Sequence, residues 1–194
     1  MFERESGDES PHSKTVDQAL HSGDLRLKFD WRGDRFGHLI EQHIAGEWQV
    51  VLESLEGLPD EDWPPSPVLQ GLHIEHRSTG AVALLVGKAG QNHWSASIEP
   101  LSNQGGFQFD IACRVQQPPQ RLGNEYRSAD CPAKPTIRVT ALSPATICEW
   151  VVHDQIKVWH IRRVEVTSEY PSTMRWQYTI AHETVSRDSN EPRC

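Results

Sequence analysis

The segment between residues 93 and 116 constrains the fold of this chain more than any other. Apolar and polar residues alternate through HWSASIEP and again through FQFDIACRVQ, and the two runs are separated by LSNQGG. Alternation with a period of two is typical of a β-strand with one buried side, and glycines favour a tight reversal. The segment therefore predicts an antiparallel hairpin. The expected partners on its polar face are His93 with Arg114, Ser95 with Ala112, Ser97 with Asp110, and Glu99 with Gln108.

Similar alternation recurs along most of the chain. Residues 25–31 and 36–41 predict a second hairpin, whose register places Trp31 opposite Phe36, Phe29 opposite His38, and Arg26 opposite Glu41. Further strands are predicted over residues 47–53, 68–77, 81–87, 137–141, 145–153, 156–166 and 174–183. Short strands with turn signals between them, and no amphipathic helix, predict an all-β fold of about ten mainly antiparallel strands. This pattern is equally compatible with a sandwich and with a barrel.

The two ends of the chain are polar and aperiodic, and they flank a single predicted domain. Residues 1–24 are rich in acidic side chains, and we expect a flexible arm there; residues 184–194 are expected to form a flexible tail. Residues 25–183 then form one all-β domain, which is an ordinary length for a β fold. Two proline-rich segments within it, residues 57–67 and 117–135, are predicted to be loops.

The charge and hydropathy of the chain limit its partners. A formal net charge of −8, with no long run of lysine or arginine, argues against a nucleic-acid surface. No segment approaches the roughly 18 apolar residues of a membrane-spanning helix. The N-terminus is acidic, whereas a secretory signal begins with basic and then apolar residues. We therefore expect a soluble, acidic, cytoplasmic protein that binds neither nucleic acid nor membrane.

The cysteines favour independent, reduced thiols. Cys113 and Cys148 fall within predicted strands, Cys131 falls in a predicted loop, and Cys194 ends the chain. A cysteine-based zinc site uses closely spaced pairs such as Cys-x-x-Cys, and no such pair is present. The alternative is a single disulfide, between Cys131 and Cys194 or between Cys113 and Cys148.

The run His73-Ile74-Glu75-His76 is a weak metal-binding pattern. On a strand, His73 and Glu75 share one face, whereas His76 points away. A third ligand would have to come from another strand, for example from His38, His43 or His182. We predict neither a metal nor a cofactor.

Glu149 and His160 form the best candidate catalytic pair. If Asp154 and Gln155 form a two-residue turn, the flanking strands place Glu149 opposite His160, with Cβ atoms roughly 5 Å apart. A carboxylate at that separation raises the pKa of a histidine and can support general acid–base catalysis. The alternative is a structural ion pair between the two strands.

The tryptophans are expected to contribute mainly to the core. Trp31 and Trp94 alternate with polar neighbours on their strands, and the register that pairs Glu149 with His160 also pairs Trp150 with Trp159. Paired aromatic residues usually pack in a core; if exposed, the pair would form a platform on which a flat ligand stacks.

A ligand-binding mouth is predicted where the two proline-rich loops meet. If these loops lie at the same end of the domain, four of their residues would line it: Trp63, Arg121, Tyr126 and Arg127. The alternative is a packed lid with arginines on its surface. On the polar face of the central hairpin, His93 and Arg114 are further candidate ligand-binding residues.

These features predict a non-catalytic module that binds a small polar ligand or a protein. Two alternatives stay open. One is an enzyme, a lyase, isomerase or hydrolase, in which Glu149 and His160 act as acid and base. The other is a structural subunit of a homo- or hetero-oligomer. The sequence determines neither the ligand nor the oligomeric state.

Overall fold

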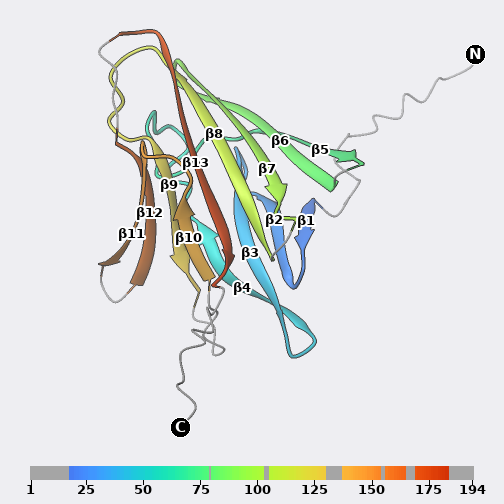
Figure 1. Ribbon diagram of the computed structural model, residues 1–194. Coiled ribbons are helices and arrows are strands. Elements are labelled where there is room, and N and C mark those ends of the chain that lie inside the picture. The colour runs from blue at the N-terminus through green and yellow to red at the C-terminus, as the bar shows by residue number, and fades with distance from the viewer. Residues whose placement is uncertain are drawn as a thin grey trace, which may run out of the picture.

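The protein is an all-β sandwich. The computed structural model describes residues 18–78, 80–102, 105–129, 137–153, 156–164 and 169–183. Within these ranges, 13 strands form two antiparallel sheets of seven and six strands, packed face to face (Figure 1). The predicted all-β class with mainly antiparallel strands is confirmed, and the arrangement is a sandwich.

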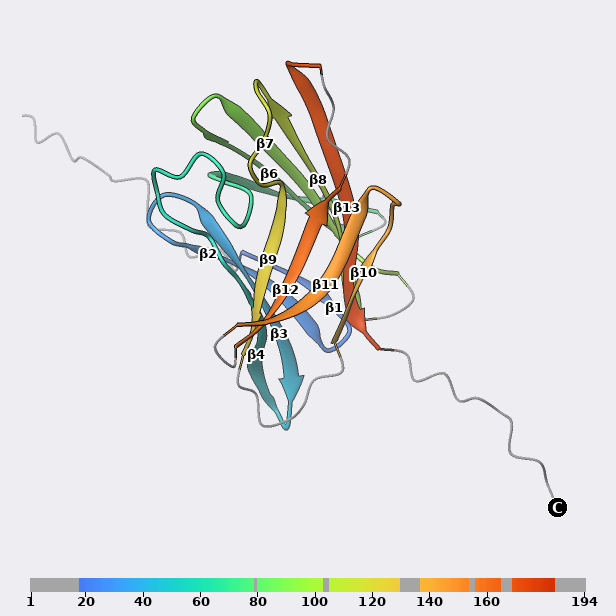
Figure 2. The same cartoon turned by 90° about the vertical axis from the view of Figure 1, so that its left-hand side faces the viewer.

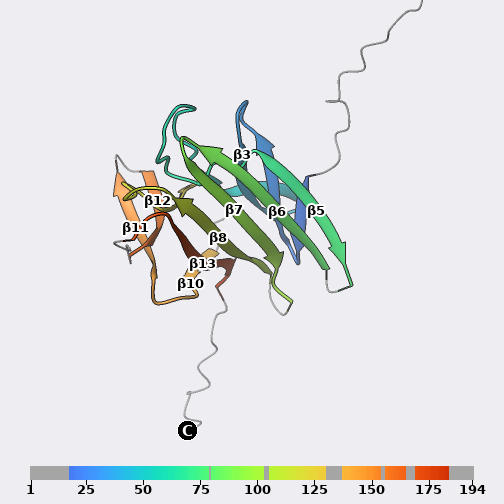
Figure 3. The ribbon, with the colours of Figure 1, turned by 90° about the horizontal axis from the view of Figure 1, so that it is seen from above.

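The strands of each sheet follow a fixed order. In the seven-stranded sheet the order is β1 (Ala19–Ser22), β2 (Leu25–Trp31), β3 (Phe36–Ile44), β4 (Glu47–Ser54), β9 (Gly123–Ser128), β12 (Ile156–Arg163) and β11 (Thr146–His153). In the six-stranded sheet it is β10 (Ile137–Ala141), β13 (Ser172–His182), β8 (Gly106–Val115), β7 (Asn92–Pro100), β6 (Gly80–Ala89) and β5 (Gly71–Arg77). Figures 2 and 3 show these two layers from the side and from above.

The three predicted hairpin registers are confirmed. Strands β7 and β8 place His93 opposite Arg114. Strands β2 and β3 place Trp31 opposite Phe36. Strands β11 and β12 place Glu149 opposite His160. Each register follows from a short turn and from the need to keep one side of both strands apolar, since a slip of one residue would exchange the buried and exposed sides.

The sequence pattern does not predict two of the strands. Strand β1 lies in the segment predicted to be a flexible arm, and β9 lies in the predicted loop 117–135. A strand of four residues is too short for a periodic signal. In β9 the core-facing residues are Asn124 and Tyr126, so the buried side does not stand out as apolar. Residues 1–17, 130–136 and 184–194, with Cys131 and Cys194, lie outside the described residues.

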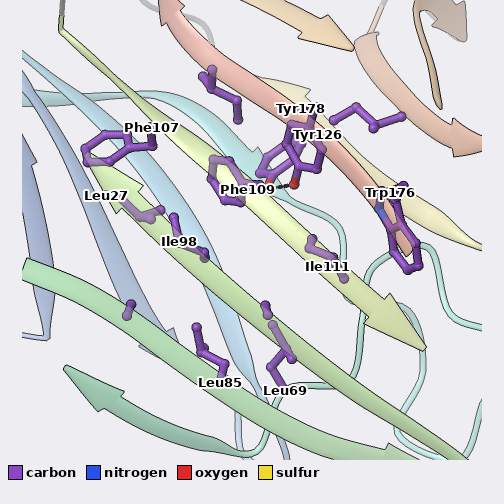
Figure 4. Packing of buried hydrophobic residues seen from close by; sticks show 14 of the residues in the cluster. Leu27, Leu69, Leu85, Ile98, Phe107, Phe109, Ile111, Tyr126, Trp176 and Tyr178 are labelled. Atoms are coloured by element: carbon purple, nitrogen blue, oxygen red, sulfur yellow. Dashed lines mark hydrogen bonds between the residues drawn. The ribbon is translucent and has the colours of Figure 1, made fainter. Parts of the chain in front are cut away.

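The core lies between the sheets and is built from alternate side chains of their strands (Figure 4). The ring of Phe109 stacks on that of Tyr178, with centroids 4.7 Å apart. Each fully buried side chain of this size contributes about 1.5–3 kcal/mol relative to an exposed one. The labelled members in Figure 4 are Leu27, Leu69, Leu85, Ile98, Phe107, Phe109, Ile111, Tyr126, Trp176 and Tyr178.

The expectation that the tryptophans lie in the core is only partly correct. Trp94 and Trp159 are buried, but Trp31 and Trp150 are about half exposed. Trp31 is the last residue of β2, where the chain leaves the sheet, and its ring contacts that of Phe36 edge to face. Trp150 lies on β11, the last strand of its sheet, and its ring contacts that of its predicted partner Trp159, with centroids 4.0 Å apart.

No helix in the described part of the chain has the length and apolar character needed to cross a lipid bilayer.

Candidate functional site

A pocket of about 350 Å³ lies where the connection between β8 and β9 meets the end of β12. Its volume is at the lower end of the range for small-molecule sites. It opens to solvent, since the side chains of Arg121 and Arg162 at its wall are about half exposed. The pocket is lined by Pro119, Gln120, Arg121, Leu122, His160, Arg162 and Arg163.

Strand β12 supplies one wall of this pocket. His160 and Arg162 are two residues apart and point to the outer side of the sheet, whereas Trp159 and Ile161 point into the core. Strand β9 pairs with β12 so that Gly123 lies opposite Arg162. Residues 119–122, which immediately precede β9, are therefore brought to the end of β12.

Two backbone features hold the second wall against β12. The backbone N–H of Arg163 donates a hydrogen bond to the carbonyl oxygen of Leu122 (3.1 Å). At Gly123, a Cβ atom would lie 2.0 Å from the carbonyl oxygen of Ile161, so only glycine allows the two strands to approach this closely. The position of Arg121 beside His160 therefore depends on a glycine two residues further along the chain.

The lining side chains of the pocket are cationic or neutral. The guanidinium groups of Arg121 and Arg162 and the imidazole of His160 face it, whereas Arg163 Nη1 donates to the carbonyl oxygen of Arg175; no carboxylate is among the lining residues. Acidic residues pair with these groups from the sheet beside the pocket. Arg162 Nη2 pairs with Glu149 Oε1. Glu125 Oε1 lies 3.7 Å from Arg121 Nη1 and 3.5 Å from His160 Nδ1.

The predicted pair of Glu149 and His160 has the expected register but different side-chain partners. Glu149 binds Arg162, and the carboxylate next to His160 is Glu125 of the neighbouring strand β9. His160 lines the pocket and Glu149 is not among its lining residues. A catalytic role for Glu149 and His160 stays a prediction.

The four residues predicted to form a mouth lie in different environments. Arg121 lines the pocket. Trp63 and Tyr126 belong to the core cluster, and Arg127 pairs with Glu53 on the outer side of the sheet at 2.6 Å. His93 and Arg114 face each other on β7 and β8, exposed on the outer side of the other sheet. Of the predicted site residues, Arg121 and His160 line the pocket.

Most of the pocket depends on β9, which the sequence pattern does not predict. Strand β9 (residues 123–128) pairs with β12, and this pairing brings Arg121 and Glu125 next to His160 and Arg162. The short basic run His160-Ile161-Arg162-Arg163 was the available signal. Alternation along a strand places His160 and Arg162 on one side, where a neighbouring loop can close a pocket.

A second polar cluster lies inside the sandwich and was not predicted. The backbone N–H of His38 donates to Ser54 Oγ (2.6 Å), and Ser54 Oγ donates to Glu56 Oε1. His38 Nδ1 lies 3.2 Å from Tyr126 Oη, which lies 2.9 Å from Tyr178 Oη. Burial lowers the pKa of His38 to about 4 and raises the pKa of Glu56 to about 7. None of these residues lines the pocket.

Arg35 closes one end of this cluster. Its guanidinium is almost fully buried and donates to the carbonyl oxygens of Glu56, Leu58 and Pro59 at 3.0–3.1 Å, and to Asp34 Oδ2 at 2.7 Å. These bonds fix the start of the proline-rich segment 57–67 against the sheet. Because Nε, Nη1 and Nη2 of Arg35 all donate within the fold and none of the cluster residues lines the pocket, we interpret this cluster as structural.

Among the described residues, no three histidine, cysteine, aspartate or glutamate side chains are grouped so as to hold a metal ion. His73 and Glu75 lie on the edge strand β5. The possible third ligands are elsewhere: His38 is buried in the core, His43 contacts Trp48, and His182 Nε2 lies 2.6 Å from Asp24 Oδ1.

The chain matches no protein-family model, no curated protein and no solved structure.

Proposed function

We propose that this protein is a non-catalytic module that binds a small polar ligand in the pocket between residues 119–122 and β12. The observation that supports the proposal is the pocket itself, which unites Arg121 with His160 and presents their polar groups to solvent. Its second wall is fixed by the hydrogen bond from Arg163 to Leu122 and by the close approach at Gly123. A largely pre-formed site of this kind loses little conformational entropy when a ligand binds.

An enzymatic role receives less support from the same geometry. General acid–base catalysis by Glu149 and His160 requires both groups to reach a substrate within hydrogen-bond distance. His160 lines the pocket, but the carboxylate of Glu149 is held by Arg162 and is not among the lining residues. A binding role requires only the polar groups that already face the pocket.

Ligand binding is testable with a charge-neutral variant that fills the pocket. A set of small cationic, neutral and anionic compounds is screened by protein-observed NMR, with Gln120→Trp as the blocking variant. Gln91→Trp is the matched control, because Gln91 is an exposed glutamine in the turn between β6 and β7 of the other sheet. Binding that is lost in Gln120→Trp and kept in Gln91→Trp is the expected result. A screen without any such compound would contradict the proposal.

A second candidate function is self-association through the edge strand β11. Its outer neighbour position is empty within the described sheet, and its exposed apolar side chains are Ile147, Trp150, Val151 and Val152, with Ile156 beside them on β12. An exposed apolar edge strand is a ready template for pairing with another strand. We therefore propose that a second copy of the chain pairs with β11.

Sedimentation velocity tests this second candidate. Val152→Lys introduces a charge that blocks edge pairing, and Val86→Lys is the matched control, because these valines are 65% and 61% exposed and Val86 lies on an interior strand. The expected result is a dimer that Val152→Lys converts to a monomer and Val86→Lys leaves unchanged. A wild-type protein that is monomeric at all concentrations would exclude this function.

A further inference from the structure

We infer that the ligand of the pocket carries an oxyanion group, a phosphate or a carboxylate, and that Glu125 is the internal carboxylate with which this group competes. The inference rests on the proposed function, because it names the ligand class of the same pocket. It follows from the chemistry of the lining residues, from the geometry around Glu125, and from the size of the site.

The lining side chains offer many hydrogen-bond donors and few acceptors. Each guanidinium group carries five N–H donors and no acceptor, and the guanidinium groups of Arg121 and Arg162 face the pocket, whereas that of Arg163 donates to the carbonyl oxygen of Arg175 on β13. Among the lining side chains, acceptors are limited to the Gln120 amide oxygen and a ring nitrogen of His160. Guanidinium donors match the geometry of carboxylate and phosphate oxygens, with which they form short, charge-assisted hydrogen bonds.

The guanidinium of Arg121 makes no short hydrogen bond to the described residues. Its Nη1 atom lies 3.7 Å from Glu125 Oε1, which is too long for a hydrogen bond. The described residues provide no other acceptor within hydrogen-bond distance of this guanidinium, and its side chain is 43% exposed. A ligand oxygen in the pocket would give Arg121 the short contact that Glu125 does not provide.

Glu125 occupies the position of a weak internal counter-ion. Its backbone carbonyl oxygen accepts hydrogen bonds from Leu55 N (2.9 Å) and from Ser66 Oγ. Its backbone N–H donates to the same Ser66 Oγ. Its Oε1 atom faces both Arg121 and His160, but at 3.7 and 3.5 Å. Because the strand holds Glu125 away from both groups, an incoming oxyanion can approach them more closely than this carboxylate does.

The size of the pocket limits the ligand to a small molecule or to the charged end of a larger one. A volume of about 350 Å³ accommodates a phosphate or a short carboxylic acid. The donors lie on two walls, Arg121 on the loop and His160 with Arg162 on β12. A bound oxyanion would therefore bridge the loop and the strand.

The test is an NMR titration with inorganic phosphate and, separately, with succinate, at constant ionic strength so that general screening does not change. Saturable shifts are expected at the amides of residues 120–122 and 160–163. Arg121→Gln is expected to weaken binding about tenfold, because it removes charge-assisted hydrogen bonds. Glu125→Gln is expected to strengthen binding about two- to fivefold, because it removes the competing carboxylate. The tighter of the two probes identifies the oxyanion type.

Arg77→Gln is the matched control for the loss of an arginine. Arg77 is 42% exposed, compared with 43% for Arg121, pairs with Glu75, and lies on β5 of the other sheet. It should leave the affinity unchanged, and dispersed amide spectra of all variants verify that they are folded. Shifts that do not saturate, or that weaken equally in Arg77→Gln, would overturn the inference.

The outcomes also separate this inference from the proposed function. If a neutral or cationic compound binds in a manner that Gln120→Trp abolishes, while phosphate and succinate do not bind, the pocket is a ligand site but the oxyanion assignment is wrong. If no compound of any charge binds, both the assignment and the proposed function fail.

Discussion

His38 and Glu56 are linked through Ser54. Burial lowers the pKa of His38 and raises the pKa of Glu56, so both shifts favour the neutral form. The pKa of His38 falls from 6.5 to about 4, so the folded protein keeps the imidazole neutral where the unfolded chain protonates it. This contribution makes the fold less stable as the pH falls below about 6.5. The pKa of Glu56 rises from 4.5 to about 7, so the folded protein retains a proton that the unfolded chain loses. That contribution makes the fold less stable as the pH rises from about 4.5 to 7, and the two effects oppose each other.

Replacing Glu56 by glutamine should expose the effect of His38. The amide keeps an acceptor for Ser54 but cannot titrate, so the stability that Glu56 contributes at acidic pH disappears. The free energy of unfolding is measured by urea denaturation at pH 7 and pH 5. The decrease between these two pH values should be larger in Glu56→Gln than in the wild type by about 2 kcal/mol. Equal decreases in both proteins would show that Glu56 is ionised in the fold.

The two described cysteines should react slowly with thiol reagents. Cys113 and Cys148 are free thiols, and burial raises their pKa values to about 12 and about 11. Because the thiolate is the reactive form, both are expected to resist iodoacetamide at pH 8 in the native protein and to react in urea. Peptide mass spectrometry measures the modified fraction at each site. Rapid labelling of Cys113 without urea would contradict its burial in the core.

At the scale of single elements, the strands with clean alternation are the predictable ones. The hairpins β2–β3, β7–β8 and β11–β12 have the predicted registers, because their partners are close in sequence and one side of each strand is apolar. Strand β9 is different. Asn124 and Tyr126 face the core through hydrogen bonds, to Trp176 Nε1 (3.0 Å) and Tyr178 Oη (2.9 Å), so its buried side is polar in sequence.

Glycine at position 123 should be essential for the position of β9. In Gly123→Ala the new Cβ would lie 2.0 Å from a backbone oxygen of β12, and neither strand can shift without losing its pairing. We expect a loss of about 3 kcal/mol in the free energy of unfolding. Gly71→Ala is the control, since its Cβ would lie 3.3 Å from Val86 Cγ2 and 3.8 Å from the Val86 carbonyl oxygen, an ordinary van der Waals distance. Similar stability of the two variants would contradict the close approach of β9 to β12.

At the scale of the whole molecule, buried side-chain hydrogen bonds between β9 and β13 join the sheets. Tyr126 and Asn124 belong to β9 of the seven-stranded sheet, and their partners Tyr178 and Trp176 belong to β13 of the other. Figure 4 shows the bond between the two tyrosine hydroxyl groups within the core. Such bonds fix how the two layers align, because a relative shift of the sheets would leave buried donors unsatisfied.

A double-mutant cycle on the tyrosines measures this coupling. Tyr178→Phe should cost about 1 kcal/mol, and Tyr126→Phe should cost more, because it also removes the contact with His38. The double variant should be less destabilised than the sum of the two, by about 0.5–1 kcal/mol in urea denaturation. Additive effects would show that the hydroxyl groups do not interact across the sheets.

The sequence by itself determines the all-β class, most of the strands and the register of three hairpins. These properties depend on residues close together in the chain, where alternation and turn residues act directly. The tertiary structure decides the sandwich, the strand β9 and the pocket. Strand β9 pairs with β4 and β12, which are distant in sequence, and this pairing brings Arg121 and Glu125 to His160. Pairing between distant strands depends on how two whole sheets bury their apolar sides together. The alternation within one strand therefore does not predict which distant strand it pairs with.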